Sequence, residues 1–323
     1  MTATLPEHVQ QTFARFITTE YTTVDAQGQP ITWPVTPYYR RGGPVIEVTT
    51  GVGYPKKAED ARRNPHVALL FSDPTGSGID RAPAVLVQGT ASVDDHDLKA
   101  ANRERYRREA IEKLPGARKT MPPKTIDALF DWYLMRIYVK VRPERVFVWP
   151  EGDFEREPEL FGAHMEEVRS GHSEEPEEAH TPAGGGVVWD DRVAELGRKY
   201  ETGVLSALAP DGFPISARLP ISVDEAGRRI RIERDPAGLP LAPGRACLAA
   251  HEHDPDFSWQ VNFHVRGDLV RDGDGWILVP HKIVGGFELP PTSTLKRYRL
   301  NAKKMMRLRR AGKRELARRS SRR

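Results

Sequence analysis

Residues 21–35 read Tyr-Thr-Thr-Val-Asp-Ala-Gln-Gly-Gln-Pro-Ile-Thr-Trp-Pro-Val, and residues 204–218 read Val-Leu-Ser-Ala-Leu-Ala-Pro-Asp-Gly-Phe-Pro-Ile-Ser-Ala-Arg. In both stretches, a run with strand character leads to Gly-x-Pro and then to a second run of the same kind. Glycine supplies a positive φ at the turn, and the proline returns the chain to an extended conformation. Each stretch therefore predicts two strands joined by a tight turn.

Further landmarks follow both turns in the same order. A third strand comes at 44–49 and at 228–233, an apolar strand then ends at an Asp-Pro pair, and a long strand with an internal glycine follows. The offset between the two copies is 184 at Gly-x-Pro, 181 at Asp-Pro and 178 at the strand glycine, which is Gly89 or Gly267. A slowly drifting offset predicts a tandem repeat of one β-rich unit.

The composition agrees with a β-rich protein of about two domains. The 323 residues include 27 Gly and 27 Pro, which favour short strands and turns over a helical bundle. We expect helices at 7–16, 55–64, 94–112 and 125–134. Six short strands per unit, with one helix between the third and the fourth, predict a small Greek-key barrel.

Charge divides the chain further. Residues 151–186 carry 11 acidic residues against two arginines and end in a glycine run, which indicates a linker. Residues 294–323 carry 14 Lys/Arg and one acid, with Leu295, Tyr298, Ala302, Met305 and Met306 at roughly helical spacing. We expect a basic helix on the barrel that becomes disordered from Ala311, with weak contact to polyanions through this tail.

The predicted organisation thus has four parts. Residues 1–150 form a barrel domain with a candidate phosphate site, 151–186 an acidic Gly/Pro linker, 187–293 a second, degenerate barrel, and 294–323 a basic tail. Neither a signal peptide nor a transmembrane segment is expected, and the single cysteine, Cys247, rules out an intrachain disulfide. These features favour a cytoplasmic protein.

The first half resembles the pyridoxamine-5'-phosphate oxidase-like FMN-binding split β-barrel superfamily. The features that carry the resemblance are Val-Asp-x-x-Gly-x-Pro at 24–30, Val-Thr-Thr at 48–50, the lysine pair at 56–57, Ala-Arg-Arg-Asn-Pro-His-Val-Ala-Leu at 61–69, Val-Leu-Val-Gln-Gly-Thr-Ala at 85–91 and Val-x-Val-x-Pro-x-x-Val at 139–146. The second half looks like a weaker copy that lacks the lysine pair and Arg-Arg-Asn-Pro. The resemblance implies two tandem six-stranded Greek-key split β-barrels plus a basic C-terminal helix.

The same resemblance implies a cofactor, which is FMN or coenzyme F-420, with haem a weaker alternative. Thr49 and Thr50 at a strand end, a glycine loop, and Lys56 and Lys57 at a helix start together suit a phosphate. Further candidate contacts are Tyr54 over the cofactor, Arg62 or Arg63 at the phosphate, and residues 34–36 and Gln88 at the ring.

No residue stands out as a general acid or base, so the catalytic residues stay unassigned. His251 and His253 lie at i and i+2 of a strand, as a metal or haem ligand pair would, with His264 and His281 nearby in sequence. Histidines at a strand end near a domain interface are the simpler interpretation, and no metal is predicted.

Two functions of different classes follow. The first is a flavin- or deazaflavin-dependent oxidoreductase that transfers hydride to or from a small organic substrate, with the barrels forming an intrachain pseudo-dimer or a homodimer. The alternative is a non-catalytic sensor or interaction protein that binds flavin or haem and whose basic tail contacts polyanions. An absorbance spectrum with cofactor titration discriminates between binding and non-binding chains.

Overall fold

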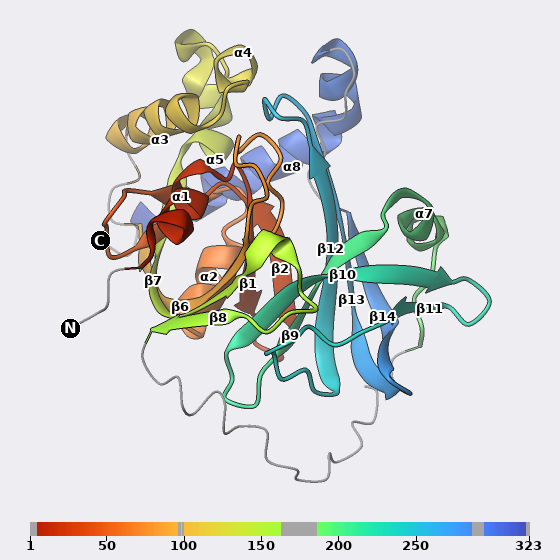
Figure 1. Ribbon diagram of the computed structural model, residues 1–323. Coiled ribbons are helices and arrows are strands. Elements are labelled where there is room, and N and C mark those ends of the chain that lie inside the picture. Colours follow the sequence, from red (N-terminus) through yellow and green to blue (C-terminus); the bar gives the residue numbers. More distant parts are fainter. Residues whose placement is uncertain (1–4, 96–97, 99, 163–185, 286–293, 321–323) are drawn as a thin grey trace.

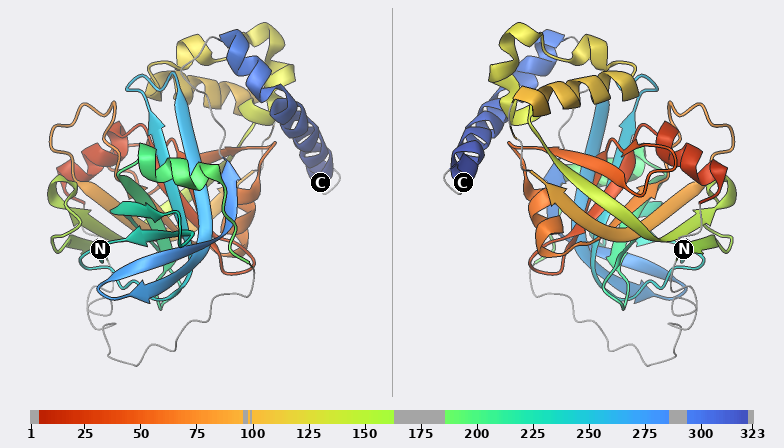
Figure 2. Two further views of the ribbon diagram at one scale, coloured as in Figure 1. Left: turned by 90° about the vertical axis from the view of Figure 1, so that its right-hand side faces the viewer. Right: turned by 90° about the vertical axis from the view of Figure 1, so that its left-hand side faces the viewer.

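Two β structures, one from each half of the chain, lie side by side in a computed structural model (Figure 1). The structure describes residues 5–95, 98, 100–162, 186–285 and 294–320. Most helices belong to the first half or to the C-terminal segment, and those of residues 100–134 and 294–320 lie together at one end of the molecule, as Figure 2 shows. The prediction of a mainly β protein with two barrel-like halves and a C-terminal helix is confirmed.

The first half forms a curled sheet in the order β2-β1-β5-β6-β7-β4-β3, with β8 paired to β7. Its strands are β1 (Thr19–Val24), β2 (Pro30–Val35), β3 (Tyr38–Tyr39), β4 (Ile46–Gly51), β5 (His66–Phe71), β6 (Ala84–Asp94), β7 (Arg136–Trp149) and β8 (Glu159–Gly162). The two ends of this order, β2 and β3, are consecutive in the chain and are separated by Thr36 and Pro37 alone. Proline lacks the N–H that would continue the ladder, so the strand breaks there while the sheet curls round.

The second half forms a closed barrel in the order β10-β11-β14-β13-β12-β9. Its strands are β9 (Thr202–Leu208), β10 (Pro214–Asp224), β11 (Arg229–Ile232), β12 (Gly244–His253), β13 (Gln260–Asp272) and β14 (Gly275–Gly285). Here β10 is unbroken and pairs with β9 at one end and with β11 at the other. Because β10 continues without a break from its pairing with β9 to its pairing with β11, the sheet closes into a barrel.

The strand registers of the two halves are equivalent. The matched pairs are Thr22–Thr32, Thr22–Ala68 and Ala68–Gln88 in the first sheet, and Ser206–Ser216, Ser206–Cys247 and Cys247–Arg266 in the second. The offset is 184 in the first two strands, 179 in the next and 178 in the fourth. For the strand that precedes Asp-Pro, the offset is therefore 179 and not the 181 expected from the Asp-Pro pairs. The reason is that the chain runs two residues further in the second half between the aligned strand positions and Asp-Pro.

Both long strands bulge at the glycine that the sequence singled out. The register shifts between Gln88 and Gly89 in one half and between Arg266 and Gly267 in the other. A Cβ on Gly89 would lie 2.2 Å from the carbonyl oxygen of Arg142, so a larger residue does not fit without moving the backbone. The glycine thus permits the close approach of two strands at the bulge.

The boundary between the halves is centred on four buried hydroxyls from equivalent positions. They are Thr22, Thr32, Ser206 and Ser216. Thr32 Oγ1 lies 2.6 Å from Ser206 Oγ, which is 2.8 Å from Ser216 Oγ, and Thr22 Oγ1 is 3.0 Å from Ser216 Oγ. One apolar core also crosses this boundary, because Leu86 and Trp149 of the first sheet pack with the second barrel. The halves are therefore joined by both polar and apolar contacts.

Helices appear where helical spacing indicated them in the first half. They are α1 (Glu7–Arg15), α2 (Lys56–Arg63), α3 (Ala100–Lys113), α4 (Ala117–Thr120), η1 (Lys124–Phe130) and α5 (Asp131–Leu134), with the short η2 (Pro150–Gly152) after β7. In the second half, α7 (Asp191–Lys199) precedes β9, and a loop at 233–243 connects β11 to β12. The expectation of a helix between the third and fourth strands is thus correct for the first half and wrong for the second.

Two expectations at the ends of the second half need correction. The acidic segment 151–186 is not all linker, because Phe154 is buried and β8 pairs with β7; residues 163–185 lie outside the described part. The tail forms α8 (Thr294–Ser320) and does not become disordered at Ala311. Over the described residues, none of the helices is long and apolar enough to span a membrane.

A candidate cofactor site at the boundary of the two halves

Lys57 is the cation that the fold turns inward at this boundary. It sits in the first turn of α2, half-buried, with its Nζ 5.1 Å from the ring centre of Trp33 and 5.6 Å from that of Tyr54. Among the described residues, no carboxylate pairs with this ammonium group. Burial, together with the charge of nearby Arg136, lowers the pKa of Lys57 to about 7.

Arg136 is a second buried cation beside Lys57. Its guanidinium donates to Tyr54 Oη at 2.9 Å and to Tyr106 Oη, and it stacks at 4.0 Å on the ring of Tyr106 and 4.3 Å on that of Tyr133. Tyrosine hydroxyls and ring faces stabilise a cation but do not neutralise it. Two positive charges therefore lie among aromatic rings at the end of β4 and β7.

The second barrel adds a histidine to this cluster. His264 of β13 is buried and its ring centre lies 4.1 Å from that of Trp33. Burial, and then the charge of Lys57, lowers the pKa of His264 to about 3, so the imidazole is neutral at physiological pH. Its Nε2 lies 3.2 Å from Asn262 Oδ1 on the same strand. Side chains from both halves thus meet at Trp33.

The glycine loop at 51–53 does not present free backbone donors. The N–H groups of Val52, Gly53 and Tyr54 donate to the carbonyls of Met135, Trp132 and Gly51. A Cβ on Gly53 would lie 2.8 Å from the carbonyl oxygen of Leu308, which belongs to α8. The expectation that this loop would cradle a phosphate with its backbone is wrong, because α5 and α8 take that space.

The predicted cofactor residues separate into two groups. Tyr54 and Lys57 lie together at the boundary, next to the loop that Thr50 closes by donating to the Tyr54 carbonyl at 2.8 Å. Thr49 pairs with Tyr138 in the ladder between β4 and β7. Of the remaining candidates, Lys56 pairs with Asp60 at 2.9 Å, Arg62 with Asp95 at 2.6 Å, and Gln88 donates to the Pro214 carbonyl at 3.0 Å. Their polar groups are already satisfied within the chain.

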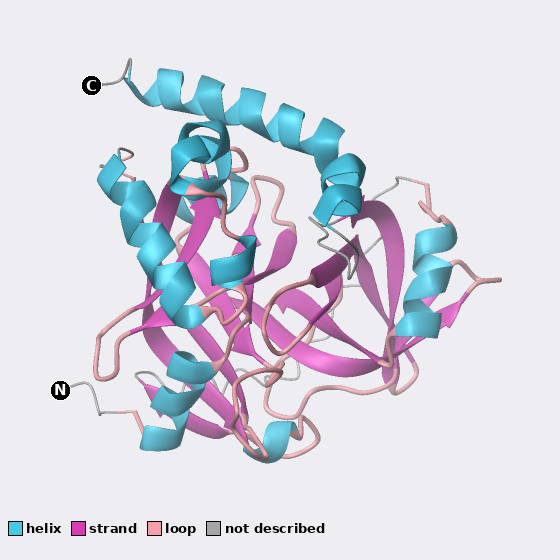
Figure 3. Ribbon diagram, turned by 90° about the horizontal axis from the view of Figure 1, so that it is seen from above, coloured by secondary structure: helices cyan, strands magenta, loops and turns pink. Residues whose placement is uncertain are grey.

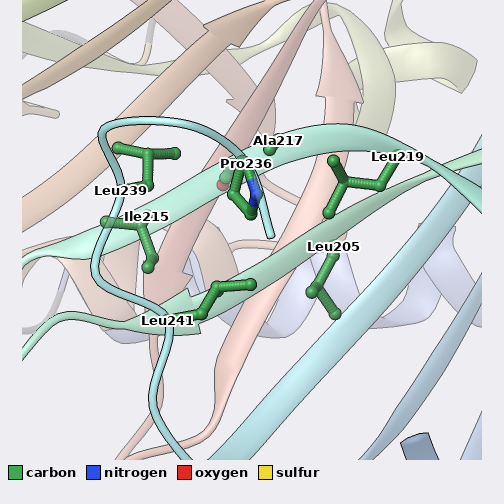
Figure 4. A pocket seen from close by; sticks show the side chains of 8 residues that line it. Leu205, Ile215, Ala217, Leu219, Pro236, Leu239 and Leu241 are labelled. Atoms are coloured by element: carbon green, nitrogen blue, oxygen red, sulfur yellow. The ribbon is translucent and has the colours of Figure 1, made fainter. Parts of the chain in front are cut away.

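At the equivalent position of the second half the chemistry is apolar. Ala217 replaces Trp33 at the offset of 184, and the loop at 233–243, which stands in place of α2, brings Leu241 next to Ala217. A small depression there is lined by Leu205, Ile215, Ser216, Ala217, Leu219, Pro236, Leu239 and Leu241 (Figure 4). It has no room even for a water molecule, whereas ligand pockets usually measure about 300 Å³ or more, so a flavin does not fit.

A second polar cluster lies on the same boundary, around the fully buried Glu20. Its Oε1 is 2.6 Å from His251 Nε2 and accepts hydrogen bonds from Arg218 at 2.9 Å and Ser72 at 3.0 Å. Burial alone would raise the pKa of Glu20, but His251 and Arg218 hold it below its usual value. His253 lies 3.4 Å from Asp73. Over the described residues, no group of three or more His, Cys, Asp or Glu side chains has a geometry that could hold a metal ion.

Sequence reasoning missed several residues of these two clusters. Arg136, Glu20 and Arg218 were not singled out, because an isolated charge in a strand carries no periodic signal. Trp33 was noticed only as part of the turn, although it lies next to the predicted ring contacts at 34–36. The repeat itself offered one signal, because the large aromatic Trp33 stands where the second copy has the small residue Ala217.

Comparison with known proteins adds a fold likeness. No protein-family model and no curated protein matches this chain. Similar solved structures include a conserved hypothetical protein from Mycobacterium tuberculosis (20% identity, 46% of this chain and 86% of that one, TM-score 0.33). Others are an F420 reductase (18%, 44% and 98%, 0.32) and a pyridoxamine 5'-phosphate oxidase-related, FMN binding protein from Nostoc punctiforme (14%, 49% and 87%, 0.33).

Of these three, only the Nostoc protein is named as pyridoxamine 5'-phosphate oxidase-related. Identities of 20% or less and TM-scores of 0.33 or less are too low to carry an argument about what this chain binds.

Proposed function

We propose that this protein binds FMN or coenzyme F-420 beside Lys57, at the boundary of its two halves, and acts as an oxidoreductase on a small organic substrate. The observation that carries the proposal is the half-buried Lys57 ammonium, which faces two aromatic rings and has no carboxylate partner among the described residues. The proposal does not depend on the backbone N–H groups of the loop at 51–53, because these groups already donate to carbonyls within the chain.

An anion at this position would relieve an unfavourable arrangement of charge. The charge of Arg136 lowers the pKa of Lys57, and Arg136 is buried while Lys57 is half-buried. Two like charges in a poorly solvated place are costly unless an opposite charge joins them. A bound phosphate, which forms strong hydrogen bonds with ammonium and guanidinium groups, supplies that charge.

The rings around the cations suit an aromatic cofactor. Trp33 and Tyr54 offer ring faces from the first half, and His264 offers a neutral imidazole from the second. When bound, the cofactor supplies the hydride chemistry, while the chain binds the phosphate, orients the ring and excludes water. Lys57 has a further role, because a group with a pKa of about 7 can hold or release a proton near neutral pH.

The proposal gives one site per chain rather than two. The equivalent position in the second half has neither a cation nor an aromatic ring on its own strands, and its pocket is small and apolar. Flavin titration should therefore saturate at one equivalent per chain.

The test is titration of the purified full chain with FMN and with coenzyme F-420, followed by absorbance. Lys57→Met should weaken phosphate-bearing cofactors at least tenfold, since a charge-assisted hydrogen bond is worth about 1.5–3 kcal/mol. Lys56→Met is the matched control, because Lys56 pairs with Asp60, and it should change affinity by less than about twofold. Absence of binding by the unmodified chain, or equal losses in both variants, contradicts the proposal.

A further inference from the structure

Helix α8 packs on the first half of the molecule. Its 27 residues correspond to about 40 Å, and Figure 3 shows it running across one end of the sheets. Gly312 allows close packing, because a Cβ there would lie 2.9 Å from the Trp132 Cβ of α5. Leu308 and Leu316 are partly buried on the same side of the helix. The small and apolar side chains of this part of α8 therefore face the protein.

Ion pairs hold the last turns of α8 in one orientation. Glu315 is buried and accepts hydrogen bonds from Arg318 at 2.8 Å and Arg319 at 2.6 Å. Arg319 also contacts Asp95 near the end of β6, and Arg318 reaches Glu59 of α2 at 3.2 Å. These contacts fix which face of the helix points to solvent.

The solvent face of α8 carries a continuous stripe of cations. Its members, at steps of four, four, three and four residues, are Arg299, Lys303, Arg307, Arg310 and Arg314. Such steps place side chains in one line along a helix. All five are exposed, and within the described residues none of them is paired with a carboxylate. Arg309 and Lys313 are exposed beside the stripe.

We propose that this stripe binds the phosphate backbone of double-stranded DNA without reading its sequence. The stripe spans about 22 Å from Arg299 to Arg314, over which a duplex presents a dense row of negative charge. Among the described residues, no carboxylate competes for these side chains, so a phosphate is their complementary partner. The surface is a separate feature from the cofactor site and does not depend on it.

The orientation of the helix argues against a membrane surface. A helix that binds lipid buries an apolar face in the bilayer, but Leu308, Gly312 and Leu316 are turned toward the protein. Met306 is the one large apolar side chain of α8 that stands out as exposed among those described, at 56%. The described part of the stripe also offers no aromatic ring on which the bases of a single strand could stack.

The experiment measures binding of the full chain to a 20-base-pair duplex of random sequence at several salt concentrations. Five phosphate contacts predict a slope of about −4.5 for the logarithm of the binding constant against the logarithm of salt. A variant with Lys303→Ala, Arg307→Ala and Arg310→Ala should bind at least tenfold more weakly at 50 mM salt. Its slope should be shallower by about 2.7. Alanine favours helix, so circular dichroism should stay unchanged.

The control variant removes the same charge elsewhere, through Arg198→Ala, Arg234→Ala and Lys282→Ala on the second half. It should bind duplex within about twofold of the unmodified chain. Equal binding by the stripe and control variants overturns the proposal. So does tighter binding to a single strand of the same length, or to phosphatidylserine vesicles, than to duplex DNA.

Discussion

Lys57 lies beside Trp33 and Leu241 beside Ala217, at equivalent strands of the two halves, yet their surroundings are built from opposite chemistry. At Lys57 a cation faces aromatic rings and has Arg136 beside it. At Leu241 the strands and loop are aliphatic, and the first half packs Trp149 and Phe154 against the neighbouring loop, with Trp149 donating to the carbonyl of Ala237. One position thus keeps charge near solvent, and the other has become part of a core.

This difference shows how two similar halves can divide their tasks. A symmetric pair of sites would place a charged compartment on both sides of the boundary, and each would weaken the apolar contact between the halves. Here the stretch after β7, which contains Phe154, supplies apolar surface to the second half. The second position therefore stabilises the pair of barrels, while the first retains unpaired charge, which is what a ligand site needs.

The largest effect is expected at Trp149, the biggest side chain in the apolar position. Trp149→Ala should lower the free energy of unfolding by about 3–5 kcal/mol, because it leaves a large cavity in a fully buried core. Trp33→Ala, at the charged position, should lose about half as much, since Trp33 is half-buried. Urea unfolding measures both. Equal losses in unfolding free energy would mean that Trp33 contributes as much to the buried core as Trp149 does.

The next largest effect concerns Glu20, whose counterpart in the second half is Val204. Because the folded-state pKa of Glu20 is depressed, its contribution to stability is present above its unfolded pKa of about 4.5. That contribution is lost as the pH falls through the lower folded value. Glu20→Gln should cost about 2–3 kcal/mol at pH 7, since it leaves the largely buried guanidinium of Arg218 without a carboxylate partner.

The measurement for Glu20 is the free energy of unfolding from pH 7 down to pH 3. The loss of stability below pH 4.5 should be shallower in Glu20→Gln than in the unmodified chain. An identical acid profile would mean that other carboxylates, such as Asp73, account for the acid dependence.

A smaller effect is expected at Gly53, where the second half has Ala237 at the same offset. Gly53→Ala should cost about 1–3 kcal/mol, because the new Cβ meets the Leu308 carbonyl of α8 and the Trp132 side chain. Ala237→Gly should cost less than about 1 kcal/mol. Differential scanning calorimetry compares the two. A harmless alanine at 53 would show that α8 can move away from the loop.

A further difference between the two positions is a pH dependence that belongs to Lys57. In the ligand-free chain its pKa is about 7 when folded and about 10.5 when unfolded, so the unfolded chain binds more protons between these values. The free energy of unfolding should therefore rise with pH across this window, and Lys57→Met should remove that rise. Lys56→Met is the control and should keep it. A rise that survives in Lys57→Met would assign the proton to another group.

Much of the fold followed from local chemistry in the sequence. Gly28 and Gly212 adopt positive φ at the predicted turns, and Gly89 and Gly267 mark the two bulges. The helix expected at 55–64 appears as Lys56–Arg63, with proline before it. The linker expected over 151–186 was partly wrong, because the acidic composition hid Phe154 and the short strand β8.

The candidate site was less accessible to sequence reasoning. The sequence predicts that the two lysines bind a phosphate together. In the helix, however, neighbouring side chains point in different directions, so Lys57 lies over Trp33 while Lys56 pairs with Asp60. Arg62 and Gln88 also matched a plausible pattern and found partners within the chain instead. Which of two neighbouring cations stays unpaired depends on what packs against the helix, and composition does not reveal that.

The sequence by itself determined the strands, the turns and the order in which they recur, since these depend on residue size, β-propensity and the special conformations of glycine and proline. It also determined that the basic charge lies in the last 30 residues. Only the tertiary structure decided that one boundary position keeps free charge and the other is apolar, and which face of α8 points outward. Those outcomes depend on contacts between residues far apart in the chain. Such contacts decide which charges are buried or paired, and a local sequence pattern does not reveal them.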